Sequence, residues 1–85
     1  MTHPIHDHRY PFIAKLLVQI RHDRGLLQQD VADRLKRNQT FVSKYESGAR
    51  RIDLIELLDI LHALDADPHE FIDRVQAQSL SGLPR

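Results

Sequence analysis

The segment from Lys36 to Arg51 gathers side chains that can bind a polyanion. It holds five basic residues and one acid, Glu46. The wider stretch 21–51 carries eight basic and four acidic side chains, whereas 52–74 carries seven acidic side chains and one basic. A basic region beside an acidic one is typical of a protein that presents one face to a polyanion and turns the other away. Two ordinary solvated faces would give the same charges, so charge alone leaves both interpretations open.

The other residues that could take part in chemistry favour neither catalysis nor metal binding. His3, His6 and His8 have a spacing that a metal site could use, but no supporting residues are evident and the chain has no cysteine. We expect these histidines to hold no metal and at most to touch phosphate weakly. No serine–histidine–aspartate set or carboxylate pair suggests a reaction, and Asp65 and Asp67 flank a turn where acids cap helices. The sequence therefore predicts neither an enzyme nor a cofactor.

Length and composition suit one small domain. The chain has 85 residues, 41% of them hydrophobic, and a formal net charge of zero, which allows a single core without a disulfide framework. The longest apolar runs have two or three residues, which excludes a transmembrane helix, and residues 1–10 lack the apolar segment of a secretory signal. We expect a cytoplasmic protein that does not bind membranes.

Apolar residues recur with helical spacing along the whole chain, and no stretch alternates as a strand does. Pro11 suits the first turn of a first helix, and Gly25 suits its end. Two short helices follow, at about 28–35 and about 39–46. The residues expected to point inward from these three helices are Ile13, Leu16, Leu17, Ile20, Val31, Ala32, Leu35, Val42 and Tyr45. The two short helices cannot persist alone in water, so the other helices must hold them.

Two further helices are predicted in the C-terminal third. Asp53 can cap the fourth helix, and Asp67 with Pro68 starts the fifth. The apolar stripe of the fourth helix, which we expect to lie in the core, consists of Leu54, Leu57, Leu58, Leu61 and Leu64. The five helices together predict one all-α domain over 9–78, between a flexible arm at 1–8 and a flexible tail at 79–85.

The two short helices have the composition of a pair that crosses steeply. Ala32 is small where the backbones must approach, Leu35 precedes a turn of about three residues, and Val42 fills the corner. This pattern is typical of a helix-turn-helix, in which the second helix protrudes and its N-terminal residues can enter a DNA major groove.

Two stretches, QQDVADRLKRNQTFVSKYESGARRID and LIELLDILHALDADPHEF, resemble the Cro- and phage-repressor-like (XRE-type) helix-turn-helix family. The resemblance covers about residues 12–72. Its most specific part is the pattern Q-x-x-[VL]-A…Q-[ST]-x-V-S-x-[YI]-E-x-G followed by a leucine-rich helix. It implies a compact five-helix, lambda-repressor-like domain that binds double-stranded DNA, usually as a dimer on a palindromic operator.

The resemblance also implies the residues that contact DNA. Gln39 matches a position that can pair with adenine, Lys44 would favour guanine, and Thr40 could meet a thymine methyl. The predicted base-reading set is Gln39, Thr40, Ser43 and Lys44. The predicted phosphate contacts are Gln28, Asn38, Ser47, Arg50 and Arg51. On this interpretation the basic stretch marks where a duplex backbone passes; a solvated face and simple loop charges are the alternatives.

Several positions near this face are expected to serve the scaffold. The resemblance pairs Arg21 with Glu46 in a structural salt bridge, and Phe41 is expected in the core rather than on a thymine methyl. Lys36 stands where the family commonly has glycine, so a positive φ there would cost about 1 kcal/mol unless the turn is shaped differently. Leu27 stands where a capping Ser or Thr is usual, which forfeits about 1 kcal/mol.

The function predicted is a sequence-specific transcriptional repressor that acts as a homodimer, because one helix reads only about 4–5 base pairs. The surface expected to pair two copies is the fifth helix with the tail: Phe71, Ile72, Val75, Leu80 and Leu83. The alternative is a protein-interaction module, such as an antitoxin, whose acidic C-terminal third binds a toxin or another regulator.

Overall fold

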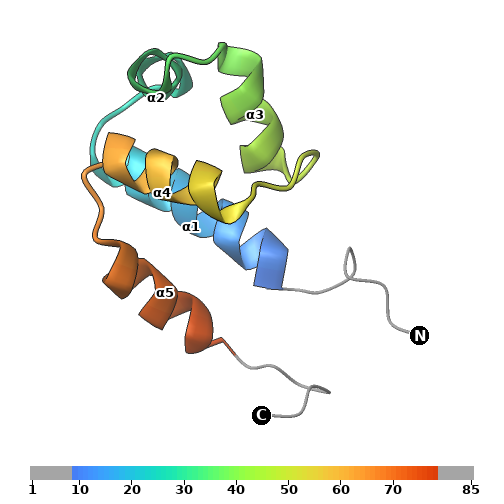
Figure 1. The fold of residues 1–85 in the computed structure, drawn as a ribbon, viewed down its shortest axis with the longest axis vertical. Coiled ribbons are helices and arrows are strands. Elements are labelled where there is room, and N and C mark those ends of the chain that lie inside the picture. Colours follow the sequence, from blue (N-terminus) through green and yellow to red (C-terminus); the bar gives the residue numbers. More distant parts are fainter. Residues whose placement is uncertain (1–8, 79–85) are drawn as a thin grey trace.

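Residues 9–78 are described by the structure, a computed structural model, and within them it contains five α-helices and no strand (Figure 1). The helices are α1 (Arg9–Asp23), α2 (Gln28–Leu35), α3 (Gln39–Ser47), α4 (Leu54–Ala63) and α5 (Pro68–Gln76). The predicted all-α fold is confirmed. The predictions for the arm at 1–8 with its three histidines, and for the tail at 79–85 with Leu80 and Leu83, lie outside the described residues.

The helix ends follow from local hydrogen bonding. Gly25 has a φ of 71°, and its N–H donates to the His22 carbonyl at 2.9 Å, while the Leu26 N–H donates to the Arg21 carbonyl at 3.1 Å. This pair of bonds closes the end of α1 with the glycine in a left-handed conformation. At the start of α4, the Asp53 carboxylate accepts from the Glu56 N–H at 2.7 Å, and the Glu56 carboxylate accepts from the Asp53 N–H at 3.0 Å. The predicted caps at these two ends are confirmed.

The core joins all five helices. Figure 1 shows α2 and α3 as a corner at one end of the molecule, α1 and α4 beneath it, and α5 at the other end. The buried residues of the core are Leu16, Leu17, Val31, Ala32, Phe41, Val42, Tyr45, Ile60, Leu61, Leu64 and Phe71. Phe41 and Tyr45 meet edge to face, with ring centroids 5.4 Å apart, so Phe41 is a core residue as predicted. The short α2 and α3 are thus held by the rest of the domain.

The predicted core stripe of α4 is partly wrong. Leu54 is 62% exposed and Leu58 is 39% exposed, whereas Ile60, which was not in the stripe, is completely buried. The inward face of α4 is Leu57, Ile60, Leu61 and Leu64. Because α4 is apolar on most of its circumference, a helical period alone did not determine which side faces the core.

The predicted pairing surface on α5 also needs a correction. Phe71 is only 3% exposed and belongs to the core, so it cannot offer a surface to a second chain. Val75 is partly buried against the same core, and Ile72 is exposed. Of the described residues in that prediction, Ile72 alone presents a large apolar surface.

Candidate nucleic-acid interface

The protruding helix α3 begins at a capped end. The Asn38 side-chain oxygen accepts a hydrogen bond from the Phe41 N–H at 3.0 Å, which satisfies one of the free N–H groups of the first turn. The helix ends at Gly48, which has a φ of 83° and donates its N–H to the Tyr45 carbonyl. Val42 and Tyr45 anchor the helix in the core. Asn38, predicted to contact phosphate, therefore has a structural role as a cap.

The four predicted base-reading residues lie on the side of α3 that faces away from the core. Gln39, Thr40 and Lys44 are exposed, and Ser43 is half-buried. Their side chains alternate with the buried Phe41, Val42 and Tyr45 along the same two turns. The structure therefore brings these four residues together as one polar surface at the N-terminal half of a protruding helix.

A chain of hydrogen bonds connects this surface to the interior. Arg21 forms a two-pronged ion pair with Glu46, at 2.7 Å from Nε to Oε2 and 3.0 Å from Nη2 to Oε1. The same Glu46 Oε1 accepts from Gln28 Nε2 at 2.9 Å, and Gln28 Oε1 accepts from Gln39 Nε2. The ionised pair is nearly buried, with side chains 10% and 5% exposed. Gln39 is thus held by a polar chain anchored in a charged pair.

These hydrogen bonds orient the side-chain amide of Gln39. One of its two N–H bonds is used by Gln28, which leaves its carbonyl oxygen and the second N–H for a ligand. An adenine edge offers the matching donor and acceptor at N6 and N7. The link between Gln28 and Gln39 was not part of the sequence prediction. The two residues are eleven positions apart on different helices, and no local pattern shows that they meet.

The turn between α2 and α3 has the conformation that glycine favours, although Lys36 occupies it. Lys36 has φ 57° and ψ 39°. The Arg37 N–H donates to the Ala32 carbonyl at 3.0 Å, and the Lys36 N–H donates to the Asp33 carbonyl at 3.2 Å. The turn is therefore shaped normally, and Lys36 bears the cost of a left-handed backbone.

The start of α2 compensates for its missing cap. The Leu27 side chain makes no capping hydrogen bond, as expected. The Asp30 carboxylate nevertheless accepts from the Leu27 N–H at 2.8 Å. Because Asp30 also places negative charge in the first turn of α2, it stabilises that end of the helix.

Much of the positive charge of the basic stretch is used inside the protein. Arg50 makes two hydrogen bonds to the Glu56 carboxylate, at 2.9 and 2.8 Å. The guanidinium groups of Arg37 and Arg50 lie 3.9 and 4.9 Å from the centroid of the Phe41 ring. Glu56 is in turn 3.9 Å from Arg37. These four residues, which we call the Phe41 cluster, tie α3 and the loop after it to α4.

The Phe41 cluster lowers the pKa of Glu56. The hydrogen bonds from Arg50, and then the one from the Asp53 N–H, lower the pKa of the Glu56 carboxyl to about 2. The carboxylate is therefore ionised throughout the ordinary pH range. Arg50, predicted to contact phosphate, faces this anion in the structure, and its charge is largely balanced there.

The other predicted phosphate contacts also have partners. The Ser47 hydroxyl donates to the Lys44 carbonyl at 3.1 Å and accepts from the Ala49 N–H at 3.3 Å. The Arg51 guanidinium lies 4.8 Å from the Tyr10 ring centroid. Tyr10 donates its hydroxyl hydrogen to the Arg50 carbonyl at 2.8 Å, and its burial raises the pKa of that hydroxyl. The loop after α3 is thus fixed by α1.

Two more arginines, in the wider basic region 21–51, close the C-terminal end of α4. Arg24 donates to the carbonyls of Leu64 and Asp65 at 2.9 and 2.8 Å, and Arg34 donates to the carbonyl of Ala63 at 2.6 Å. Cations at this end of a helix satisfy free carbonyls and oppose the helix dipole. Many arginines of region 21–51 therefore stabilise the fold. The interpretation of the basic charge as phosphate-binding did not include this structural role.

Two cations near α3 remain available to a ligand. The side chains of Lys36 and Lys44 are exposed, and neither makes a hydrogen bond or ion pair with another residue of 9–78. Lys36 follows α2 and Lys44 lies on α3, so the two flank the polar surface that Gln39 opens. A polyanion that meets this surface finds both hydrogen-bonding groups and unbalanced positive charge.

Comparison with known proteins identifies the family. A family model described as a helix-turn-helix domain matches residues 13–71. A solved structure described as an XRE-family like protein from Pseudomonas syringae pv. tomato str. DC3000 is 38% identical, with a TM-score of 0.81 over 86% of this chain and 89% of that one. No curated protein matches the sequence. The chain belongs to the XRE-type helix-turn-helix family, whose fold is that of DNA-binding transcription regulators.

Two less similar solved structures share the fold. One is a mutant of the restriction-modification controller protein C.Esp1396I bound to its highest affinity operator site OM, with 22% identity and a TM-score of 0.73 over 80% of this chain and 90% of that one. The other is the clp gene regulator ClgR from C. glutamicum, with 20% identity and a TM-score of 0.70 over 80% and 86%. Among the described residues, no helix is long and apolar enough to cross a membrane.

Proposed function

We propose that the protein is a sequence-specific repressor of transcription that binds a palindromic operator as a cytoplasmic homodimer and inserts α3 into the major groove. The observation that carries the proposal is the exposed polar surface of α3, whose Gln39 is held by Gln28 and Glu46. A side chain held in one orientation before binding loses less freedom on binding and discriminates better between base edges.

The contacts with DNA divide into two kinds. Gln39, Thr40, Ser43 and Lys44 meet base edges and determine the sequence. Lys36 and the N-terminus of α2 with Gln28 meet phosphates and add affinity without sequence preference. Arg50 and Ser47 act mainly by holding the loop after α3, since both have partners inside the protein.

A dimer follows from the amount of sequence that one helix can read. A single α3 contacts about 4–5 base pairs, which is too few to specify one site in a genome. Two copies related by a two-fold axis read two half-sites about one helical turn apart. Repression follows when the occupied operator overlaps a promoter.

Binding to the upstream DNA of the protein's own gene, compared with a scrambled duplex, tests the proposal. Fluorescence anisotropy over a salt series should show tight binding to the upstream duplex and weak, salt-sensitive binding to the scrambled one. Gln39→Ala should remove most of the difference, with a loss of about 1–3 kcal/mol in discrimination. Gln76→Ala, an exposed glutamine on α5, is the matched control and should bind as the wild type does.

The alternatives give different results. A transcription assay with the same promoter should show less transcript when the protein is added, and more transcript would identify an activator instead of a repressor. Equal weak binding to the upstream and scrambled duplexes would contradict operator recognition there. It would favour the alternative of an antitoxin-type module, which a pull-down of partners with the full chain would then examine.

A further inference from the structure

Two arginines flank α3 next to its exposed polar surface. Arg37 lies in the turn before the helix, and Arg50 lies in the loop after it. Their guanidinium groups lie 3.9 and 4.9 Å from the centroid of the Phe41 ring. Phe41 comes directly after Gln39 and Thr40 in the first turn of α3. Two positive charges therefore lie close to the residues that we propose to meet base edges.

A single carboxylate faces both arginines. Glu56, in the first turn of α4, accepts two hydrogen bonds from Arg50 at 2.9 and 2.8 Å and lies 3.9 Å from Arg37. The side chain of Glu56 is 17% exposed, whereas those of Arg50 and Arg37 are 38% and 45% exposed. The acid is thus the least exposed charge of the Phe41 cluster, and a polyanion that approaches the cluster meets the two cations first.

The ion pair between Arg50 and Glu56 is difficult to exchange for a phosphate contact. Two parallel hydrogen bonds between a guanidinium and a carboxylate are strong, because both partners are charged and their geometries match. If Arg50 left to bind a phosphate, Glu56 would keep its negative charge close to the duplex and have little access to water. The loss of these hydrogen bonds and the repulsion of the phosphates would offset the new contact.

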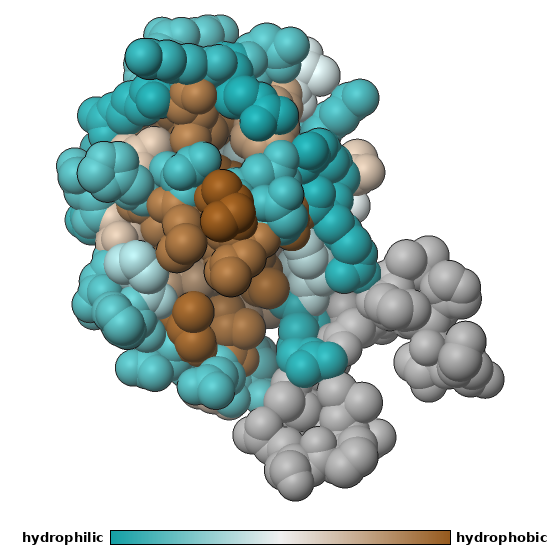
Figure 2. Space-filling view, in the orientation of Figure 1, coloured by the Kyte–Doolittle hydropathy of each residue, from teal (hydrophilic) through white to brown (hydrophobic). Residues whose placement is uncertain are grey.

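The Phe41 cluster adjoins the hydrophilic end of the molecule. In Figure 2 hydrophilic residues cover the corner that α2 and α3 form, and apolar residues gather below this corner over α4. The exposed Lys36 and Lys44 supply positive charge at the corner that no other residue of 9–78 pairs with. A change of one charge in the Phe41 cluster is therefore large compared with the charge that these two lysines supply.

We propose that Glu56 sets the sequence-independent part of the affinity for DNA, because it keeps Arg50 and, more weakly, Arg37 from binding phosphates. This inference rests on the proposed function, which brings DNA to α3, and adds a residue that does not itself touch DNA. Phosphate contacts supply essentially all of the affinity for DNA of the wrong sequence, and each further contact releases counterions and strengthens that binding. Glu56 therefore limits binding to DNA that lacks the operator and leaves recognition to Gln39 and its neighbours.

Glu56→Gln tests the proposal, because it removes the negative charge and keeps the size of the side chain. A glutamine at this position can still accept from the Asp53 N–H, so the cap of α4 is kept. In fluorescence anisotropy with a scrambled duplex, the variant should bind about three- to tenfold more tightly than the wild type at about 50 mM salt. The slope of log affinity against log salt concentration should steepen by about 0.9, the value for one further phosphate contact. Wild-type affinity and slope would overturn the proposal.

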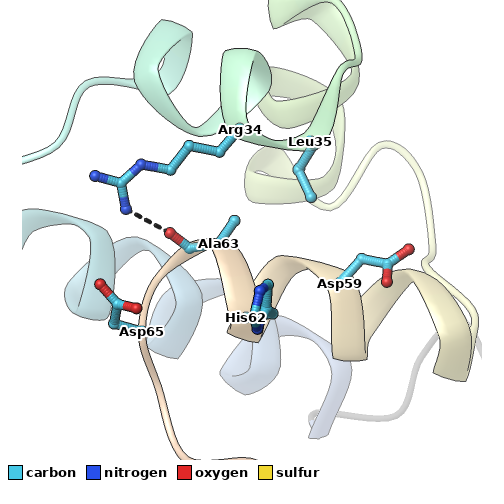
Figure 3. Close-up of a pocket in the computed structure, with 6 residues that line it drawn as sticks. All are labelled: Arg34, Leu35, Asp59, His62, Ala63 and Asp65. Atoms are coloured by element: carbon cyan, nitrogen blue, oxygen red, sulfur yellow. Dashed lines mark hydrogen bonds between the residues drawn. The ribbon is translucent and has the colours of Figure 1, made fainter.

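Two variants with the same change of charge separate the ion pair from the net charge. Asp59 lies one turn further along α4 (Figure 3), is exposed, and makes no hydrogen bond or ion pair with another residue of 9–78. Asp59→Asn should therefore gain clearly less affinity than Glu56→Gln, because it releases no arginine. Glu70→Gln, on α5 at the other end of the molecule, should bind as the wild type does. Equal gains from Asp59→Asn and Glu56→Gln would show that net charge alone sets the affinity and would overturn the proposal.

A second substitution in the same ion pair tests whether the effect depends on Arg50. Glu56→Gln combined with Arg50→Gln removes one negative and one positive charge. The double variant should return to the wild-type affinity and salt slope for the scrambled duplex. Structural damage from Glu56→Gln would not be repaired by the loss of a further ion-pairing residue. A double variant that keeps the tighter binding of Glu56→Gln would overturn the assignment to Arg50.

The wild-type protein allows a test without any substitution. The NMR signals of the Arg50 guanidinium hydrogens should stay in place when scrambled duplex is added, because the ion pair with Glu56 persists. The side-chain signals of Lys44, which has no partner among residues 9–78, should move. Equal changes at Arg50 and Lys44 would show that Arg50 leaves Glu56 for the duplex and would overturn the proposal.

The upstream and scrambled duplexes together separate this inference from the proposed function. A wild type that binds both duplexes alike, with a Glu56→Gln variant that binds both more tightly, would overturn operator recognition and leave the role of Glu56 in place. A wild type that prefers the upstream duplex, with a Glu56→Gln variant of unchanged affinity for the scrambled one, would overturn the role of Glu56 alone.

Discussion

The exposed sides of α3 and α4 differ in how they are built. The exposed side of α3 is polar, and Gln39 on it is connected through Gln28 and Glu46 to the buried Arg21. The exposed side of α4 carries the large apolar side chains of Leu54, Ile55 and Leu58, which are 62%, 66% and 39% exposed, beside the polar Asp59 and His62. Polar side chains that are oriented by hydrogen bonds to buried residues suit directional contacts with a polar ligand. Exposed aliphatic side chains are instead stabilised by contact with any surface that excludes water. The proposed recognition of base edges depends on the polar side of α3 and not on the exposed apolar side chains of α4.

The largest expected effect is on the polar anchor of α3. Glu46→Ala should lower the free energy of unfolding by about 3–5 kcal/mol, because it leaves the buried Arg21 guanidinium without its partner. Urea unfolding at neutral pH measures it, and Glu70→Ala, an exposed acid on α5, should change stability by less than about 0.5 kcal/mol. If Glu46→Ala is as stable as the wild type, the Arg21–Glu46 ion pair does not hold the exposed surface of α3 in place.

The two sides of α4 should respond differently to the same change. Ile60→Ala should cost about 2–5 kcal/mol, because Ile60 is completely buried and its removal leaves a cavity. Ile55→Ala should cost less than about 0.5 kcal/mol, because Ile55 is 66% exposed. Thermal unfolding of the two variants compares them. A loss for Ile55→Ala as large as that for Ile60→Ala would show that Ile55 packs inside the chain.

The turn before α3 should become more stable with the residue that its backbone favours. Lys36→Gly should raise the free energy of unfolding by up to about 1 kcal/mol, because glycine adopts a φ of 57° without strain. Lys36→Ala removes the same charge but keeps the strain, so it should give no gain. Denaturant midpoints distinguish the two. A gain with alanine equal to that with glycine would attribute the effect to charge.

The smallest expected effect concerns acid sensitivity at the Phe41 cluster. The pKa of Glu56 is lowered from 4.5 to about 2 in the folded protein, so its contribution to stability is present above about pH 4.5 and is lost as the pH falls toward 2. Glu56→Gln should therefore show a shallower loss of stability over that window than the wild type. Identical pH profiles from thermal unfolding would contradict the role assigned to Glu56.

The sequence predicted the elements whose causes are local. The bounds of α2 match, and the caps at Asp53 and Asp67 are present, because each depends on residues within one turn. The side chains that join distant parts of the chain were not predictable in this way. Arg24 and Arg34 reach carbonyls 40 and 29 residues away. Nothing in the spacing of basic residues distinguishes an arginine that closes a helix end from one that meets phosphate.

The apolar pattern predicted the buried face of α4 partly incorrectly, although this helix has the highest proportion of apolar residues. In α4 the leucines at 54 and 58 follow the helical period as well as those at 57 and 61, so the period allowed a stripe wider than the face that packs. The position of the buried face depends on where α2 and the other helices of the core lie, which is a property of the whole fold. The same ambiguity concealed part of the exposed apolar surface of α4, because Leu54 and Leu58, which the period predicts in the core, are exposed.

Of the five helices, α1 is synthesised first, and two of its polar side chains, together with Arg24 directly after it, have partners that come much later. Arg21 meets Glu46 after 25 residues, and Tyr10 and Arg24 meet the Arg50 and Leu64 carbonyls after 40 residues each. Because Leu64 and the core residues of α4 follow α3 in the sequence, the helix-turn-helix emerges during translation before its support is complete. Folding of the DNA-reading corner must wait until α4 has left the ribosome, and a chain that stops before α4 exposes α3 without holding it in place.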